Sequence, residues 1–338
     1  MKKVIIIAEA GVNHNGSMEL AYRLIDAAKE AGADYVKFQT FIPELLVSKK
    51  AEKAEYQIKA TGDDTTQQEM LSQLALSQEQ FKLLFRYCTE RGIGFLSTAF
   101  DNESLKFIND LNLDYHKVPS GEITNLPYLK MIAGFGKKVI LSTGMSTLDE
   151  VKEALQVLLS GGIKREDITA LQCTTEYPAP YNEVNLLAMK TMGESLGVST
   201  GFSDHTQGIE IPIASVALGA VIVEKHFTLD KNLPGPDHKA SLEPKELKQM
   251  IRSIRNVEMA MGSGTKMPAD SEIKNIAAAR RSIHIASDLP TGHILAVEDL
   301  IMKRPGTGIS PMLIDSVIGK KLRKSMSADS MLNLEDFE

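Results

Sequence analysis

The sequence predicts an α/β protein whose larger part is a closed barrel of βα units, followed by a small β-rich domain. Short β-branched runs alternate with segments of helical period from the N-terminus to about residue 262, a pattern typical of a parallel sheet. Eight strands are expected, and eight favours a (β/α)8 TIM barrel over an open sheet. The expected strands span residues 4–8, 35–39, 94–98, 115–118, 139–142, 168–173, 199–203 and 221–225.

Amphipathic segments between these strands predict the outer ring of helices. Apolar residues recur at helical spacing in residues 18–31, 77–91, 148–159 and 244–261. Residues 41–76 are too many for an ordinary βα loop, and they are charged and rich in Gln. We expect an excursion over the barrel mouth there, with the character of a lid.

Chain length and a change of character after Gly262 predict two domains. A chain of 338 residues exceeds the usual size of a single core. A polar stretch at 264–270 precedes a helical segment and short strands such as 282–285. We therefore expect the barrel in residues 1–262, a linker in 263–281 and the small domain in 282–338.

Composition narrows the class of protein. A net charge of -6 gives no reason to expect nucleic acid or an anionic membrane as partner. No stretch approaches the roughly 20 apolar residues that span a bilayer. Cys88 and Cys173 are far apart, so we expect no disulfide, a cytoplasmic location and thiols that belong to the core.

Polar residues gather where the expected strands end, which is where βα barrels build their active sites. A single Ser or Thr there needs no explanation beyond contact with solvent. Lys37 and Lys117, however, lie inside the apolar strands YVKFQ and YHKVPS, and a buried Lys needs a partner or a ligand. With hydroxyl groups and glycines nearby, two such lysines predict a site for a phosphate group.

Two histidines end neighbouring strands. His205 follows the seventh strand and His226 the eighth, so their imidazoles should lie side by side. With carboxylates nearby, the pair predicts Mn²⁺ or Mg²⁺, completed by water and substrate, rather than a closed zinc site. The alternative is a hydrogen-bonded pair of structural histidines.

Nine motifs in order carry a resemblance to a known family. They are EAGVNHNGS, VKFQT, FLSTAF, KVPSGE, ILSTGM, TTEYPAP, GFSDHT, EKHFT and GPDHKAS. The chain resembles the sialic acid synthase family over essentially its whole length, and KRPGTGI around Arg304 is similar to the antifreeze-like (SAF) domain of these enzymes.

The resemblance implies a βα barrel that condenses phosphoenolpyruvate with an N-acetylated mannosamine-type sugar and releases phosphate. It implies that phosphoenolpyruvate is bound by Lys37, Thr98, Lys117, Ser120, Ser142, Thr175 and Ser203. It implies that Glu9, Gln39, Glu122, Tyr177 and Asp237 surround the acceptor sugar. His205 and His226 would hold Mn²⁺, and Arg304 would reach the sugar from the partner chain of a domain-swapped homodimer.

Departures from the family pattern indicate the acceptor. Neuraminate synthases have Asn in the motif CTN-x-YP, where this chain has Thr175, and their KHQT here reads KFQT. These changes resemble the branch that makes legionaminic acid from 2,4-diacetamido-2,4,6-trideoxy-mannose. Phe38 would suit a 6-deoxy sugar, and the alternative is that its side chain faces the barrel wall. N-acetylmannosamine, which gives neuraminate, is the alternative acceptor.

The expected mechanism joins C3 of phosphoenolpyruvate to C1 of the sugar, with Glu9 or Glu122 handling protons and Lys37 and Lys117 neutralising the anion. One rival is an aldolase that forms a Schiff base on Lys37, Lys117 or Lys225. Another is a glycan- or ice-binding protein with a degenerate barrel.

Overall fold

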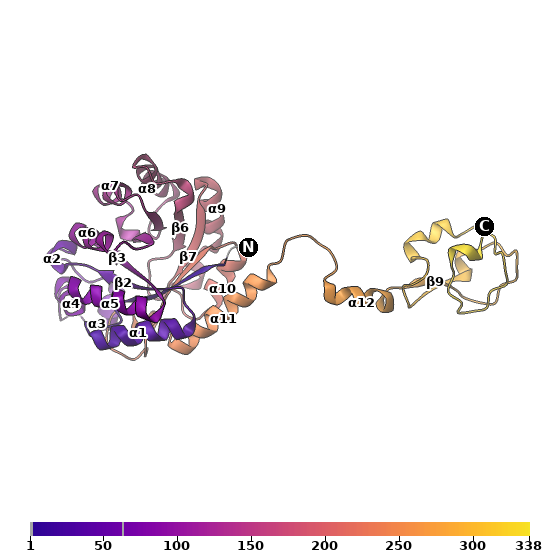
Figure 1. Ribbon diagram of the computed structural model, residues 1–338, viewed down its shortest axis with the longest axis horizontal. Helices are drawn as coiled ribbons and strands as arrows, with labels where there is room; N and C mark the ends of the chain where they lie inside the picture. Colours follow the sequence, from indigo (N-terminus) through magenta and orange to yellow (C-terminus); the bar gives the residue numbers. More distant parts are fainter. Residues whose placement is uncertain (1–2, 63) are drawn as a thin grey trace. The chain divides into compact units, whose positions relative to one another are not determined.

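The computed structural model describes residues 3–62 and 64–338 and divides into two compact units, Met1–Gly262 and Ser263–Glu338. In the first unit eight parallel strands form a closed barrel in the order of the sequence (Figure 1). The predicted fold class is confirmed. The strands are β1 Ile5–Gly11, β2 Tyr35–Thr40, β3 Gly94–Ala99, β4 Tyr115–Val118, β5 Lys138–Ser142, β6 Ile168–Cys173, β7 Ser199–Asp204 and β8 Ile222–His226.

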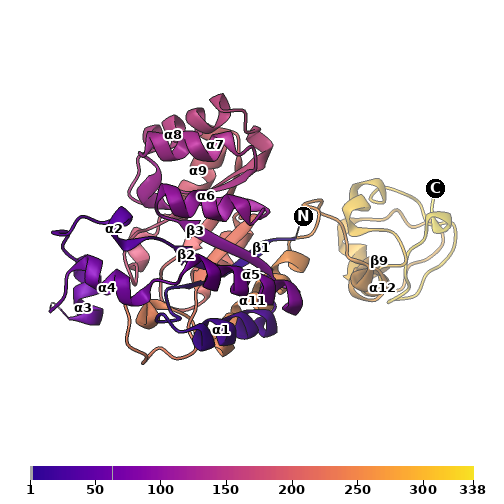
Figure 2. The same ribbon diagram turned by 60° about the vertical axis from the view of Figure 1, so that its left-hand side comes forward.

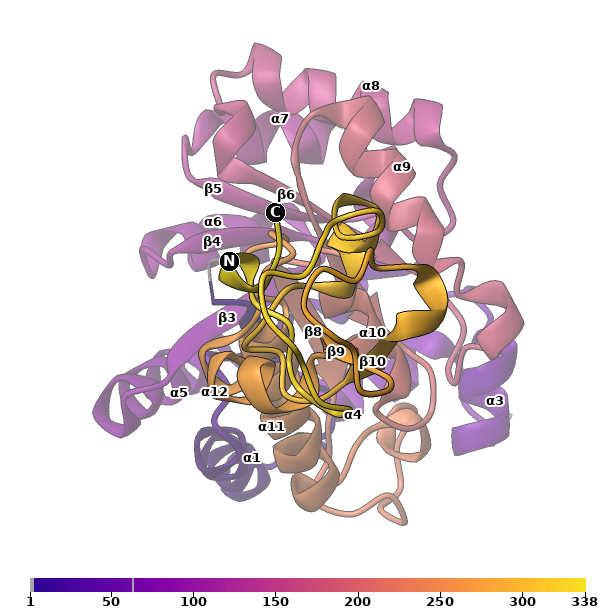
Figure 3. The ribbon, with the colours of Figure 1, turned by 90° about the vertical axis from the view of Figure 1, so that its right-hand side faces the viewer.

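Helices surround the barrel, and their ends follow from local sequence. At the N-terminal end of α1 Met18–Ala31, the Ser17 side chain accepts a hydrogen bond from the Leu20 amide. At its C-terminal end Gly32 has a φ of 91°, a conformation that glycine adopts without strain. Figure 3 shows three of the outer helices next to one another: α7 Leu126–Gly134, α8 Leu148–Ser160 and α9 Leu186–Leu196. None of the helices in the described part of the chain is long and apolar enough to cross a membrane. The ring consists of α1 Met18–Ala31, α5 Gln78–Arg91, α6 Asn102–Asp110, α7 Leu126–Gly134, α8 Leu148–Ser160, α9 Leu186–Leu196, α10 Glu210–Ala217 and α11 Pro244–Ala260.

A small apolar cluster fills the barrel interior, and it determines where polar side chains can point. The cluster comprises Ile7, Leu96, Ile140, Leu171 and Ile222. Successive side chains of a strand point to opposite faces, so the residue two positions later points inward as well. Two residues after these five come Glu9, Thr98, Ser142, Cys173 and Glu224. The apolar floor is therefore covered by a layer of polar side chains at the carboxyl ends of the strands.

The excursion at residues 41–76 folds into three short helices, which Figure 2 shows gathered on one side of the barrel. They are α2 Pro43–Leu46, α3 Glu55–Thr61 and α4 Gln67–Leu74. Phe41, Met70 and Leu74 form a buried cluster with Val12, which follows β1. These contacts hold the excursion beside the carboxyl ends of β1 and β2.

The second unit has its own core, formed by residues such as Ile283, Leu295 and Leu332. A helix, α12 Asp270–Ala279, occupies part of the segment expected to be a linker. An antiparallel pair follows, β9 Ser282–Ile285 and β10 Leu300–Lys303 (Figure 3). Isolated bridges such as Leu289 to Met326 extend the pairing, so the unit is built mainly from short extended segments.

Candidate active site

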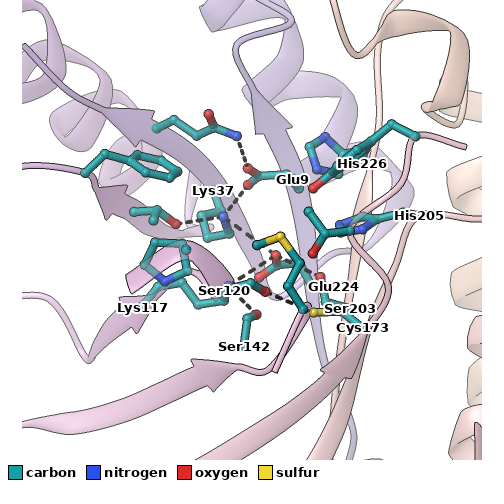
Figure 4. Close-up of a pocket in the computed structure, with 18 residues that line it drawn as sticks. Glu9, Lys37, Lys117, Ser120, Ser142, Cys173, Ser203, His205, Glu224 and His226 are labelled. Atoms are coloured by element: carbon teal, nitrogen blue, oxygen red, sulfur yellow. Dashed lines mark hydrogen bonds and ion pairs between the residues drawn. The ribbon is translucent and has the colours of Figure 1, made fainter. Parts of the chain in front are cut away.

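A cavity of about 150 Å³ opens at the carboxyl ends of the barrel strands. Figure 4 shows side chains from around the barrel pointing into it. We call it the lysine cavity. It is lined by Glu9, Lys37, Gln39, Thr98, Phe100, Lys117, Pro119, Ser120, Gly121, Ser142, Met145, Cys173, Thr175, Tyr177, Ser203, His205, Glu224 and His226.

Two lysines and two glutamates form a buried charge network in this cavity. Lys37 Nζ lies 2.8 Å from Glu9 Oε2 and 3.7 Å from Glu224 Oε1. Lys117 Nζ lies 3.6 Å from the same Glu224 oxygen. Glu224 therefore sits between both ammonium groups, and the four charges balance without a ligand, as buried charges must.

The network shifts the pKa of each member in its own direction. Burial raises the pKa of Glu9, although Lys37 opposes the rise. Burial would also raise the pKa of Glu224, but the charges of Lys117 and Lys37 outweigh it and the net shift is downward. The pKa of Lys37 is raised because Glu224 and Glu9 overcome the effect of burial, whereas burial, assisted by the charge of Lys37, lowers that of Lys117. Glu9 is thus the carboxylate of this network that most readily takes up a proton when an anion enters.

Hydroxyl groups stand next to both ammonium groups. Lys37 Nζ donates to Thr98 Oγ1 at 2.9 Å, and Lys117 Nζ donates to Ser142 Oγ at 2.8 Å. Ser203 Oγ donates to Glu224 Oε1 at 3.2 Å. Ammonium and hydroxyl donors that converge on one cavity can bind the oxygens of a phosphate or a carboxylate.

Because Gly144 has no side chain, Ser120 and Thr175 can lie close to its backbone in the cavity wall. Its amide donates to Ser120 Oγ at 3.0 Å. A Cβ at position 144 would lie 2.3 Å from Thr175 Oγ1 and 2.9 Å from Ser120 Oγ. Thr175 Oγ1 is buried and has no hydrogen-bond partner in the described part of the chain, so it remains available to a ligand.

The two histidines face one another across the mouth, with ring centroids 5.5 Å apart. His205 Nδ1 donates to the Thr174 carbonyl oxygen at 2.6 Å, which leaves the lone pair on Nε2. Burial lowers the pKa of His205 to about 4 and that of His226 well below its usual value. Both imidazoles are therefore neutral at neutral pH, the form that binds metal ions. His226 Nδ1 is buried and lacks a hydrogen-bond partner among the described residues.

This donor set fits a divalent ion that takes most of its ligands from elsewhere. Across residues 3–62 and 64–338, no group of three or more His, Cys, Asp or Glu is arranged to hold a metal. The protein would thus supply two nitrogens, and oxygens of substrate and water would complete the shell. That arrangement suits Mn²⁺ or Mg²⁺ better than a structural zinc ion.

Tyr177 and Asp237 lie next to the two histidines. The Tyr177 ring centroid lies 4.1 Å from that of His205 and 5.6 Å from that of His226. Asp237 Oδ2 lies 3.8 Å from His226 Nδ1, and burial, reinforced by the charge of Glu9, raises the Asp237 pKa to about 7. These two residues also line a second cavity of about 270 Å³, which extends beneath the excursion.

Most of the side chains singled out in the sequence converge on these two cavities. Glu9, Lys37, Gln39, Thr98, Lys117, Ser120, Ser142, Thr175, Tyr177, Ser203, His205 and His226 line the lysine cavity, and Asp237 lines the second. Glu122 lines neither: it is half-buried just beyond Ser120 and accepts a hydrogen bond from Asn125 Nδ2 at 2.5 Å. Arg304 is exposed in the second unit.

Of the two alternatives for Phe38, the structure shows the side chain that faces the barrel wall and not one that contacts the sugar site. Its side chain is fully buried and stacks on Phe95 at 5.8 Å, within the apolar layer that includes helix residues such as Leu84. Lys37 and Gln39 point into the barrel, so the intervening side chain points away from it.

Glu224 and Cys173 contact residues of the predicted site, although no role was predicted for them. Glu224 links the two lysines, as described above. Cys173, expected in the core, instead lines the cavity with its Sγ 3.2 Å from Ser120 Oγ. Strand alternation was the available signal, because both residues follow an inward apolar residue by two positions.

Comparisons with known proteins agree with this geometry. The NeuB family model matches residues 24–266, and the SAF domain model matches residues 280–338. The N,N'-diacetyllegionaminic acid synthase of Campylobacter jejuni is 52% identical over 98% of this chain and 99% of its own length. The enzyme of the same name from Legionella pneumophila is 48% identical, over 98% and 94%.

A solved structure supports the same assignment. The N-acetylneuraminic acid (sialic acid) synthetase of Leptospira borgpetersenii, in complex with citrate, superimposes with a TM-score of 0.71 at 32% identity. The superposition covers 81% of this chain and 90% of that one. The chain therefore belongs to the NeuB family and carries a C-terminal SAF domain.

Proposed function

We propose that this protein condenses phosphoenolpyruvate with 2,4-diacetamido-2,4,6-trideoxy-mannose, releases phosphate and forms N,N'-diacetyllegionaminate. The observation that carries the proposal is the convergence of Lys37, Lys117 and two neutral imidazoles on one cavity. The names of the Campylobacter and Legionella relatives support the acceptor. The free thiols Cys88 and Cys173 support a reducing cytoplasm as the location.

Phosphoenolpyruvate would occupy the lysine cavity. Lys37 and Lys117 would neutralise its phosphate and carboxylate, and the hydroxyls of Thr98, Ser142 and Ser203 already lie beside the charged groups that it would meet. The Thr175 hydroxyl, which lacks a partner in the described chain, would gain one. Each donor is in place before the substrate arrives, which lowers the cost of ordering on binding.

In the reaction, C3 of phosphoenolpyruvate bonds to the aldehyde carbon C1 of the open-chain sugar, and water adds to C2. Cleavage of the carbon–oxygen bond at C2 then releases phosphate. A divalent ion held by His205 and His226 would polarise the aldehyde oxygen. Glu9 would move the protons, because burial raises its pKa and it lies in the cavity, whereas Glu122 lies outside it.

The SAF domain would act across a homodimer. Arg304 is exposed on this domain, directly after β10. In a domain-swapped dimer it would reach the acceptor bound in the partner's barrel, where an Arg can bind the oxygen of an N-acetyl group.

The rival chemistries fit the site less well. A Schiff base requires an unprotonated amine, but Lys37 is paired with Glu9 and has a raised pKa. Burial lowers the pKa of Lys117, but its ammonium group donates to Ser142 Oγ and lies 3.6 Å from Glu224 Oε1. Lys225 is paired with Asp204 in the protein interior. A non-catalytic binding protein would not need the buried charge network of the lysine cavity, which is costly to assemble.

The deciding experiment measures phosphate release from phosphoenolpyruvate with Mn²⁺ and each of two acceptors. Preference for 2,4-diacetamido-2,4,6-trideoxy-mannose is the expected result. Preference for N-acetylmannosamine would make the protein a neuraminate synthase. Absence of release with both sugars, from folded protein, would refute a synthase.

A further inference from the structure

The second cavity adjoins the lysine cavity and has the opposite character. The two cavities share one wall, which is formed by Gln39, Phe100, Thr175, Tyr177 and His226. Six apolar side chains of the excursion line its far side, and we call this second cavity the apolar cavity. These side chains are Phe41, Leu46, Val47, Met70, Leu71 and Leu74.

The carboxyl group of Asp237 lies at the end of the apolar cavity next to the histidines. Asp237 and His226 stand at that end, and no Lys or Arg of the described chain lines the cavity. Gln57 and Gln67 also line it, but they bond to each other at 3.3 Å, and Gln57 Oε1 also accepts from the Ala54 amide. The Tyr56 hydroxyl of the excursion also lines the cavity and accepts from Gln57 Nε2 at 3.4 Å. The excursion thus offers a largely apolar surface, with two amides and one hydroxyl whose hydrogen bonds are already partly used.

We propose that the apolar cavity is the specificity site for the end of the acceptor sugar remote from its aldehyde, and that it selects a methyl group over a hydroxymethyl or a phosphate. This inference rests on the proposed function. If phosphoenolpyruvate fills the lysine cavity, the aldehyde must lie at the shared wall beside His226. The remaining carbons of the sugar then extend into the apolar cavity, whose volume of about 270 Å³ is the larger of the two.

The selection rests on the different free-energy changes when a methyl, a hydroxymethyl or a phosphate group is transferred from water to this surface. A methyl group gains free energy when it leaves water for the surface of Leu46, Val47 and Met70. A hydroxymethyl group in the same place would lose hydrogen bonds to water without regaining them. A phosphate would be buried without a cation, which costs far more. Discrimination at one such group is typically about 10- to 200-fold.

Two neighbouring residues allow a matched test. Val47 and Leu46 line the cavity and are only half-buried, so they can be changed without removing the core. Leu45 is 55% exposed and does not line it. Val47→Thr adds a hydroxyl at nearly constant volume, Leu46→Gln adds an amide, and Leu45→Gln is the control.

The measurement is kcat/KM for the 6-deoxy acceptor divided by kcat/KM for N-acetylmannosamine, together with KM for phosphoenolpyruvate. We expect Val47→Thr and Leu46→Gln each to lower the ratio about tenfold with an unchanged KM for phosphoenolpyruvate, and Leu45→Gln to leave both unchanged. We also expect the wild-type protein to reject N-acetylmannosamine 6-phosphate.

Three outcomes would overturn the inference while leaving the synthase intact. They are an unchanged ratio in both cavity variants, an equal change in the control, and efficient use of the 6-phosphate. Absence of phosphate release from the wild-type protein with every sugar would instead refute the proposed function itself.

Discussion

Lys225 Nζ lies 2.5 Å from Asp204 Oδ2, and both side chains are completely buried. The two residues are paired in the register of β7 with β8, and each directly precedes one of the two site histidines. Asp204 also accepts hydrogen bonds from the amide and hydroxyl of Thr206, and Lys225 donates to the Thr206 carbonyl. The Asp204–Lys225 pair therefore joins the ends of β7 and β8, and this fixes the relative position of the following His205 and His226.

Removing Lys225 should destabilise the barrel and loosen the two imidazoles. Lys225→Met leaves the Asp204 carboxylate buried without its cation, a loss of roughly 3–5 kcal/mol. Adding Asp204→Asn should restore part of that stability, because the unpaired charge is gone. Chemical denaturation of the wild type, both single variants and the double variant measures the coupling. Strictly additive losses would show that the pair does not act as a unit.

Lys117 should matter for phosphoenolpyruvate far more than for the sugar. Lys117→Met removes a charged donor next to Ser142, so we expect KM for phosphoenolpyruvate to rise by about 10²-fold, corresponding to about 2–3 kcal/mol. Lys138→Met is the matched control, because Lys138 lies exposed at the opposite end of the adjacent strand. A rise in the KM for the acceptor instead would show that Lys117 does not bind phosphoenolpyruvate.

His226 should be required for metal binding but not for the fold. We expect His226→Ala to abolish Mn²⁺-dependent turnover and to weaken Mn²⁺ binding, measured by the Mn²⁺ electron paramagnetic resonance signal in the presence of phosphoenolpyruvate. Circular dichroism should stay unchanged. His293→Ala is the control, since His293 pairs with Asp299 in the second unit. Undiminished Mn²⁺ binding by the His226→Ala variant would show that His226 is not a ligand of the metal ion.

Removal of the metal from the wild-type protein makes a separate prediction. Chelation by excess EDTA should stop phosphate release, and added Mn²⁺ or Mg²⁺ should restore it. The described residues form no group of three metal ligands, and an ion held by two neutral imidazoles binds reversibly. Full activity in EDTA would contradict a metal-dependent reaction.

Arg304 should act on the partner's barrel. We expect Arg304→Ala to raise KM for the acceptor about tenfold or more while KM for phosphoenolpyruvate changes little, since a charged hydrogen bond is worth about 1.5–3 kcal/mol. Mixing this variant with His226→Ala should restore activity, because a heterodimer then has one complete site. Random exchange between dimers predicts about a quarter of wild-type activity, and activity no higher than that of the separate variants would contradict the swapped arrangement.

The periodicity of the sequence was sufficient to predict the barrel but not all of its site. The β-branched runs located every barrel strand, and β4 and β6 have the predicted limits, because strand ends coincide with turn residues. The same alternation places Phe38 on the opposite face of β2 from Lys37 and brings Cys173 beside Ser120. Predicting these positions requires knowing which face of each strand points into the barrel. The apolar cavity depends on how α2 and α4 pack against Val12, a tertiary contact that no local pattern specifies.

The buried His116, whose side chain does not line either cavity, should make the stability of the barrel sensitive to acid. Its ring packs against Phe135 at 5.0 Å and shares a hydrogen bond of 3.3 Å with Asn109. Burial, assisted by the charge of Lys137, lowers its pKa from 6.5 to about 4. As the pH falls from about 6.5 to about 4, the unfolded chain takes up a proton at this position that the folded chain does not, so the free energy of unfolding decreases.

The variant His116→Gln isolates this contribution, because Gln keeps a polar group near Asn109 but does not titrate. At neutral pH we expect the variant to be less stable, since it loses the ring contact with Phe135. The stability difference between wild type and variant should then shrink by up to about 1.4 kcal/mol for each pH unit below 6. Urea unfolding at pH 7.5, 6 and 5 measures it. Parallel pH profiles for the two proteins would mean that His116 is protonated in the folded state as readily as in the unfolded one.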